Sequence, residues 1–363
     1  MNYDSAYNKK LNRLAAQRLR RIKAIYEKTA ENLTKDIWHY RMSRLDNYRG
    51  TYYFRRNRLL YRQVTETLHG MTDEIVNEIE SGVKDGWRLI DEKNNLTARQ
   101  YRGLIDVPTK AYLNTDALNS FMDRRYGQSP ISKNIWQHAK VGRDAIDNYL
   151  GSGILEGRGA AKIARLNGDL RNALMEPNRL FRRVRNSKGN LVLSSAAKKY
   201  HPGRGVYRSS YKNAFRYARN EIRTAQAYAD YERRISAPYV TGIRVKRGSS
   251  LFECSVCDAN VGDYPKEFIF TPWHVSGICY STSILMSREE LRDYLRNGVV
   301  PESKMVRTLP KGHVDWVKQN QTKLMKYHND TPWLKDNYTQ KLTTRKSLNL
   351  GETLKGVSDE AGN

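Results

Sequence analysis

Three cysteines and one histidine are the residues of this sequence whose types and spacing best suit a chemical task. Cys254 and Cys257 form a Cys-x-x-Cys pair, His274 follows after sixteen residues, and Cys279 follows after four more. A Cys-x-x-Cys turn presents two thiolates to one ion, and the later histidine and cysteine supply two further corners of a tetrahedron. The spacing therefore predicts a Cys3His zinc site.

We expect this zinc site to be structural, because four protein ligands leave no position open for a catalytic water. Two other interpretations remain. A redox Cys-x-x-Cys pair would require a βαβ context, which the sequence does not show. Alternatively, this is a former metal site whose buried free thiols are held by packing alone. Asp258 and Asp263 have three possible roles: carboxylates that accept hydrogen bonds from the metal ligands, a substitute ligand, or plain turn residues.

Three further histidines do not form a catalytic metal constellation in the sequence. His201, His313 and His328 lie in unrelated contexts. Each is expected to be a surface or capping residue. The sequence therefore does not predict an enzyme.

Positive charge is the strongest global feature of the chain. Its 363 residues include 64 Lys and Arg against 38 Asp and Glu, a net charge of +26. Such an excess favours polyanionic partners, either nucleic acid or an acidic protein surface. No apolar run approaches the roughly 20 residues that a membrane helix needs. The candidate contact residues lie in two predicted helices: Lys212, Arg216, Arg219, Arg223, Arg13, Arg20 and Arg21.

Those residues must be positioned by helices, because apolar side chains recur at helical spacing through most of the chain. The clearest seam runs from Tyr211 to Ala229, with the basic row beside it. Solvent exposure and contact with phosphate or an acidic partner are equally open interpretations of that row. Further helices are predicted over 8–35, 58–85 (ending at Gly82 and Gly86), 97–127 in short pieces, 135–150, 160–175, 289–297 and 314–325.

Three short segments have strand character. A turn at 187–190 predicts a two-stranded ribbon, residues 239–246 alternate as a strand does, and residues 268–270 are a second strand candidate. Glycines between 151 and 159 predict a connection between helices. The predicted fold class is α+β and mostly α-helical, with long amphipathic helices and a small β ribbon clasped by the Cys3His site.

Several of these parts resemble one known family. The stretch from Ala218 to Ala227 resembles the Ala-Arg-Thr-Glu helix of the phage head morphogenesis (Mu F-like) minor head proteins. That family continues with a short strand, a Cys-x-x-Cys pair and a Gly/Tyr turn, matched here by Cys254, Cys257, Gly262 and Tyr264. Its closing His-Pro-x-Cys-Arg-Cys corresponds to the segment 274–279. Residues 200–214 resemble a version common in prophages of gut bacteria.

The resemblance covers roughly residues 140–290 and includes departures. Asn220 replaces the family threonine, and Val275 replaces the proline after the histidine. Gly277 and Ile278 replace the first closing cysteine and the arginine, so only Cys279 remains of the closing pair. Four metal ligands are still present, but the closing turn must differ. A weaker likeness continues from Leu309 to Asn337.

Composition, periodicity and the resemblance together divide the chain into four consecutive regions. These are a basic helical region (1–130), a Mu F-like domain with the Cys/His knuckle (131–290), a helical segment (291–338) and a polar tail (339–363) that is mobile or ordered only by a partner. The resemblance implies a non-enzymatic virion component that acts in head assembly at the portal or inner shell. Its partners would be the portal protein, the major capsid protein and packaged double-stranded DNA, with no membrane. We expect it in the host cytoplasm during assembly and then in the virion.

Two alternative functions stay open. One is a zinc-containing nucleic-acid-processing enzyme such as a nuclease. The other is a toxin-like effector carried in the head, although the segment after residue 290 is short and polar for a separate enzyme domain.

Overall fold

The computed structural model describes residues 3–39, 58–107, 114–126, 131–155, 167–176, 183–185, 187–193, 209–248, 253–274, 277–341 and 347–350. The chain divides into two compact units, each built from separate stretches. Unit 1 comprises Met1–Ala15, Gly82–Arg124 and Arg219–Asn363, and unit 2 comprises Ala16–Ser81 and Arg125–Ala218. These boundaries differ from the four consecutive regions expected from the sequence. Whether those regions have separate roles remains a prediction.

Unit 2 is a helical body with a continuous apolar core. It contains the C-terminal part of α1 (Asp4–His39), the N-terminal parts of α2 (Arg58–Arg99) and α8 (Ser210–Ile235), and α4 (Ile131–Leu155) and α6 (Asn167–Met175). Apolar residues three or four positions apart fall on one face of each helix, which they bury together. The core includes Ile22, Leu33, Leu68, Ile135, Leu174 and Ala218.

Two predicted helix ends were wrong. Helix α2 runs through Gly82 and Gly86 to Arg99, and both glycines are buried. A Cβ on Gly86 would lie 3.0 Å from Cγ of Gln226, so this glycine permits close packing rather than ending the helix. Helix α4 likewise continues through Gly151 to Leu155, and the rest of the predicted glycine-rich turn lies outside the described residues.

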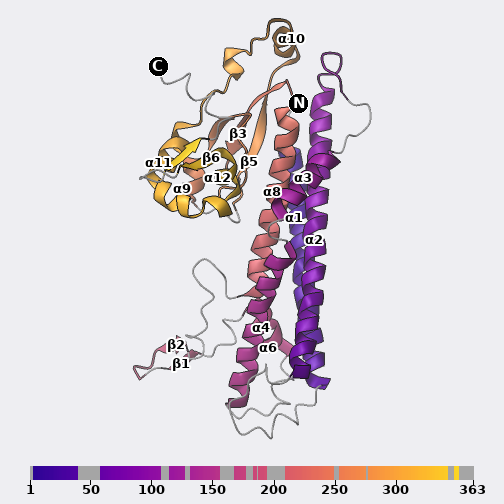
Figure 1. Ribbon diagram of the computed structural model, residues 1–363, viewed down its shortest axis with the longest axis vertical. Helices are drawn as coiled ribbons and strands as arrows, with labels where there is room; N and C mark the ends of the chain where they lie inside the picture. Colours follow the sequence, from indigo (N-terminus) through magenta and orange to yellow (C-terminus); the bar gives the residue numbers. More distant parts are fainter. Residues whose placement is uncertain are drawn as a thin grey trace. The chain divides into compact units, whose positions relative to one another are not determined.

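Unit 1 contains a three-stranded antiparallel sheet in the order β4-β3-β5. The central strand β3 (Val240–Lys246) pairs with β4 (Gly262–Pro265) on one side and β5 (Tyr280–Leu285) on the other. Figure 1 shows the helices α9 (Ser255–Ala259), α11 (Lys311–Lys326) and α12 (Pro332–Asn337) gathered around this sheet. The strand predicted at 239–246 is therefore confirmed as β3.

The second strand candidate, residues 268–270, was wrong. Phe268 and Phe270 are buried in an apolar cluster, while the backbone N–H and C=O of Ile269 bond to the side chain of Asn337 at 2.9 Å each. A side-chain amide thus replaces the neighbouring strand as the hydrogen-bonding partner.

The other elements of unit 1 are mostly helical. Helix α10 has a capping box between Ser287 and Glu290, and Gly298 ends it in the left-handed conformation with φ of 71°. These elements are α3 (Thr115–Tyr126), α9 (Ser255–Ala259), α10 (Arg288–Asn297), η4 (Glu302–Lys304), α11 (Lys311–Lys326), η5 (His328–Asp330) and α12 (Pro332–Asn337).

Two hairpins complete the described structure. Strands β1 (Arg183–Arg185) and β2 (Leu191–Leu193) confirm the ribbon predicted around residues 187–190. Strands β6 (Tyr338–Lys341) and β7 (Ser347–Leu350) pair in the region expected to be a polar tail that is mobile or ordered only by a partner. That part of the tail is therefore paired within the chain, and residues 351–363 lie outside the described ones.

The histidine predictions were wrong at two positions. His313 is fully buried at 0% exposure, and His328 is buried at 7%. His328 Nε2 lies 2.7 Å from the carbonyl oxygen of Tyr338, so both histidines belong to the interior packing of unit 1. His201 lies outside the described residues.

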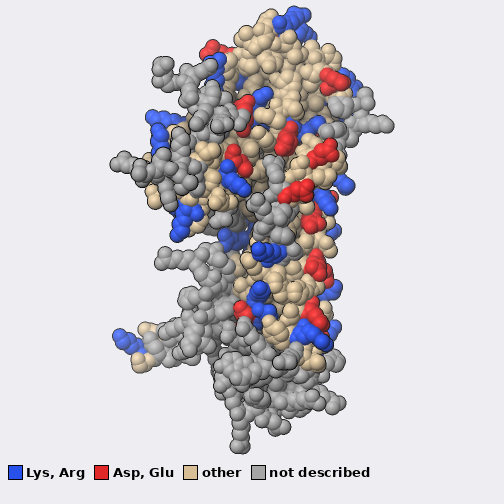
Figure 2. Space-filling model, in the orientation of Figure 1, with Lys and Arg blue, Asp and Glu red and all other residues tan. Residues whose placement is uncertain are grey.

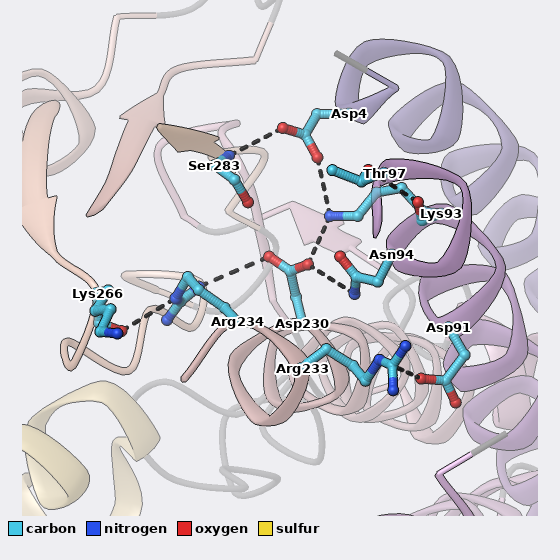
Figure 3. Close-up of polar contacts among 10 residues, drawn as sticks. All are labelled: Asp4, Asp91, Lys93, Asn94, Thr97, Asp230, Arg233, Arg234, Lys266 and Ser283. Atoms are coloured by element: carbon cyan, nitrogen blue, oxygen red, sulfur yellow. Dashed lines mark hydrogen bonds and ion pairs between the residues drawn. The ribbon is translucent and has the colours of Figure 1, made fainter. Parts of the chain in front are cut away.

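A buried charge cluster stabilises another part of unit 1 (Figure 3). The Nζ of Lys93 lies 2.5 Å from Oδ1 of Asp230 and 2.9 Å from Oδ1 of Asp4. Burial alone would lower the pKa of Lys93, but the two carboxylates outweigh burial and raise it. Arg234 also pairs with Asp230, and the backbone N–H of Ser283 in β5 donates to Asp4. The cluster thus fixes the first turn of α1 to the sheet.

Candidate metal centre

The Cys-x-x-Cys segment forms the short helix α9. Cys254 is its N-cap residue, in extended conformation, and its Sγ accepts a hydrogen bond from the backbone N–H of Cys257 at 3.4 Å. One helical turn brings the two side chains to the same side. Thiolates that bind metal commonly need such donors, because a backbone N–H stabilises negative charge on sulfur.

His274 faces both thiols of this turn. Its Nε2 lies 3.3 Å from Sγ of Cys254 and 3.3 Å from Sγ of Cys257. The three ligand atoms all lie within 4.8 Å of one another. A tetrahedral zinc ion with bonds of about 2.3 Å to sulfur and about 2.05 Å to nitrogen separates such atoms by about 3.6 Å. The two nitrogen-to-sulfur distances therefore need to lengthen by only a few tenths of an ångström to hold zinc.

Cys279, the fourth predicted ligand, lies against Cys257 but outside that closest group of three. Its thiol hydrogen-bonds to the thiol of Cys257, and both side chains are buried. Cys279 directly precedes β5, so the sheet fixes its backbone. Val275 and Ser276 of the closing turn lie outside the described residues. The four predicted ligands are thus brought together, three of them tightly.

The surroundings of the thiols are apolar. Burial raises the pKa of Cys257, as do its hydrogen bonds to Cys254 and Cys279, and burial also raises the pKa of Cys279. The thiols of Cys257 and Cys279 are therefore protonated at neutral pH without a cation. A divalent cation would displace these protons, as soft thiolate sites for zinc require.

The two aspartates near the cysteines form ion pairs with arginines. Arg247 Nη1 lies 2.6 Å from Oδ1 of Asp258. Arg244 makes a two-pronged contact with Asp263, at 2.7 and 2.8 Å. These pairs support the interpretation of both aspartates as structural residues beside the site rather than as substitute ligands.

Arg223, predicted to contact nucleic acid or a partner, makes two hydrogen bonds within unit 1, and its predicted contact remains a prediction. Its Nη1 donates a hydrogen bond to the carbonyl oxygen of Gly277 in the closing turn. Its Nη2 donates to Oδ1 of Asn12 at 2.7 Å. Burial, and to a smaller extent the neighbouring Arg219, lowers the pKa of this guanidinium to about 10. Arg223 therefore connects α8 to the candidate metal centre.

The other predicted contact residues differ in exposure. Arg13, Arg20, Arg21 and Lys212 are exposed, whereas Arg216 and Arg219 are partly buried. Arg21 Nη1 lies 3.6 Å from Oε1 of Glu78. In Figure 2, acidic side chains alternate with basic ones on the visible face. Part of the positive charge is therefore matched locally, and nucleic-acid contact by these residues remains a prediction.

Across the residues that the structure describes, none of the helices combines the length and apolar character needed to cross a bilayer.

Comparison with known proteins gave no relatives: no protein-family model, no curated protein and no solved structure matches the chain.

Proposed function

We propose that this chain is a non-enzymatic minor head protein of a bacteriophage, in which a structural Cys3His zinc centre closes a small β module onto a long helix. One observation carries the proposal. The Cys254, Cys257 and His274 ligand atoms converge within 4.8 Å, and the closing turn beside them is hydrogen-bonded to α8 through Arg223. The two parts on which the family resemblance rests, the helix and the cysteine module, therefore belong together.

A second contact supports this attachment. Arg234 of α8 donates to the carbonyl oxygens of Lys266 at 3.1 Å and Phe268 at 2.9 Å. These carbonyls lie between β4 and His274, so α8 is bonded to the module on both sides of the histidine ligand. Zinc in such a place acts by fixing structure, since a small ribbon with little core can gain about 10 kcal/mol of folding free energy from metal binding.

The proposed partners follow from the resemblance and the charge. The portal protein and the major capsid protein are the protein partners, and packaged double-stranded DNA is the polyanion, with no membrane in the assembled head. The protein would act in the host cytoplasm during head assembly and remain in the virion through DNA packaging until ejection. The net charge of +26 supports contact with DNA.

Copurification tests the head-protein proposal. We would express the chain with its phage portal and capsid proteins, sediment the assembled heads, and quantify the chain and its zinc in the head fraction. The proposal expects both to sediment with heads. A chain that stays in the supernatant and degrades DNA in a metal-dependent way would support the nuclease alternative. A chain that sediments with heads but poisons cells after delivery would support the effector alternative.

DNA contact is tested separately by salt dependence. Neutralising phosphates releases counterions, so the logarithm of the binding constant should fall linearly with the logarithm of salt concentration, by about 0.9 per phosphate contacted. We expect the combined variant Arg13→Gln, Arg20→Gln and Lys212→Gln to have a shallower slope. Arg244→Gln, whose side chain pairs with Asp263, is the matched control. A flat response for the unmodified protein would remove DNA from the partners.

A further inference from the structure

Arg223 is a partly buried cation whose described contacts lack a matching negative charge. Its hydrogen-bond acceptors, the Gly277 carbonyl and the Asn12 amide oxygen, are both neutral. Among the described residues, none of the ion pairs includes Arg223. A guanidinium taken out of water needs a counter-charge or its burial is costly.

The nearby carboxylates do not supply that charge. Asp4 and Asp230 line the same cavity of about 80 Å³ as Arg223, but Lys93 pairs with both of them and Arg234 pairs with Asp230. Two carboxylates and two cations balance within that cluster. The positive charge of Arg223 is therefore left over.

The metal centre would supply the missing charge. Cys279 lines the same cavity as Arg223, and the bond from Arg223 reaches Gly277, two residues before that thiol. One divalent cation bound by three thiolates and a neutral histidine carries a net charge of −1, because the thiolates contribute three negative charges. A single arginine beside the centre balances it.

We propose that Arg223 is the counter-charge of the Cys3His metal centre, so that it favours the thiolate, metal-bound form and holds the closing turn against α8. This inference rests on the zinc site of the proposed function. Arg223 acts as a positioning residue and not as a ligand. Groups that orient and polarise metal ligands in this way typically affect metal affinity by about 10- to 100-fold.

Arg247 is the natural comparison for this role. Its partner Asp258 directly follows the ligand Cys257 in the sequence, so Arg247 also lies beside the candidate metal centre. The charge of Arg247, however, is already matched by Asp258 at 2.6 Å. The unmatched arginine is expected to influence metal binding more than the matched one.

The test is competitive zinc titration of the full-length protein with a chromogenic chelator. The variants are Arg223→Met, which removes the charge, and Arg223→Lys, which keeps it. Arg247→Met is the matched control, and circular dichroism verifies folding. We expect zinc affinity to fall about 10- to 100-fold in Arg223→Met, with most of it retained in Arg223→Lys and a smaller change in Arg247→Met. If Arg223→Met does not fold, the comparison of Arg223→Lys with Arg223→Gln replaces it.

The outcomes separate two failures. Zinc bound by the unmodified protein with equal affinity in the charge-removing variant would overturn the role of Arg223 alone. Absence of zinc binding in the unmodified protein would overturn the metal site and this inference together. Stabilisation by inorganic phosphate that disappears in Arg223→Met, with zinc affinity unchanged, would assign Arg223 to an anion in the cavity and would also overturn the proposal.

Discussion

The Nδ1 of His313 lies 2.5 Å from Oδ1 of Asn260, three residues beyond the second cysteine of the candidate metal centre. The Asn260 amide is oriented by its Nδ2, which donates to the carbonyl of Val256. Its Oδ1 therefore accepts from His313, which fixes the proton of the neutral imidazole on Nδ1. Nε2 then accepts from the hydroxyl of Tyr338 at 2.8 Å. One histidine thus links α9, α11 and β6.

Replacing His313 with phenylalanine should destabilise unit 1 while keeping an aromatic ring in place. Asn260 and Tyr338 would each lose a buried hydrogen-bonding partner, at a combined cost of about 2–4 kcal/mol. Urea unfolding followed by tryptophan fluorescence measures the loss. His69→Phe is the control, because His69 is exposed and stacks on Trp136 at 3.6 Å between ring centroids. Equal stability of the two variants would contradict the proposed link.

Stability should also depend on pH through His313. Burial lowers its pKa to about 3, below the ordinary value of about 6.5. Below pH 6.5 this histidine therefore binds a proton in the unfolded chain but stays neutral in the folded chain. The free energy of unfolding falls as the pH falls towards 3. Between pH 7 and pH 5 this histidine alone should cost about 2 kcal/mol.

The measurement compares urea unfolding at pH 7 and pH 5 in the unmodified protein and in His313→Phe. The variant should lose less stability on acidification. The variant will keep the loss of stability that is due to His138. Burial, and to a smaller extent Arg216, lowers the pKa of His138 to about 4. Identical pH dependence in both proteins would show that folding does not lower the pKa of His313.

Lys93→Met should be among the most destabilising single changes in unit 1. Two buried carboxylates, Asp4 and Asp230, would lose their shared cation, which typically costs about 3–5 kcal/mol for a buried pair. Lys10→Met is the matched control, because Lys10 and Glu92 are 3.8 Å apart with side chains 49% and 54% exposed. Such exposed pairs contribute about 1 kcal/mol at most. Chemical denaturation measures the free energy of unfolding of both variants. A smaller loss of stability in Lys93→Met than in Lys10→Met would be incompatible with the buried cluster.

Two helical glycines should respond to alanine in opposite directions. A Cβ on Gly142 of α4 would lie 2.6 Å from Cδ2 of Leu174, which is fully buried, whereas Gly70 of α2 has no atom within 4 Å of its added Cβ. Gly142→Ala should cost about 1–3 kcal/mol through overpacking. Gly70→Ala should gain about 0.5–1 kcal/mol from helix propensity. Thermal melting of both variants is the measurement, and stabilisation by both would disprove the tight packing between α4 and α6.

Local patterns predicted the parts of the fold in which one element determines its own burial. The seam from Tyr211 to Ala229 became α8 because apolar spacing alone defines the buried face of a helix. The helix end predicted at Gly86 was wrong, because this glycine instead makes room for the side chain of Gln226, which is distant in sequence. Strands β4 and β5 were not predicted. Strand β4 contains Gly262 and Pro265, two residue types that are uncommon inside strands, so its pattern did not indicate a strand. Proline is tolerated there because β4 lies at the edge of the sheet, where a backbone N–H donor to a neighbouring strand is not needed.

The candidate site was predictable as far as ligand spacing determines it. Cys254, Cys257 and His274 came from the sequence because metal-ligand spacing is a local signal. The role of Arg223 was not predictable, because a basic residue in a helical row has the same pattern whether it faces solvent or the carbonyl of Gly277. His313 gave no signal either, since a single histidine has no periodicity that reports burial.

Metal content tests the account most directly. Zinc quantified in the full-length protein purified without added metal, with parallel thermal melts in the presence and absence of chelator, should show one zinc ion per chain and a lower melting temperature after chelation. Cys257→Ser should contain no zinc and melt as the chelated protein does. A metal-free unmodified protein whose melting temperature is unchanged by zinc and by chelator would contradict the structural metal centre.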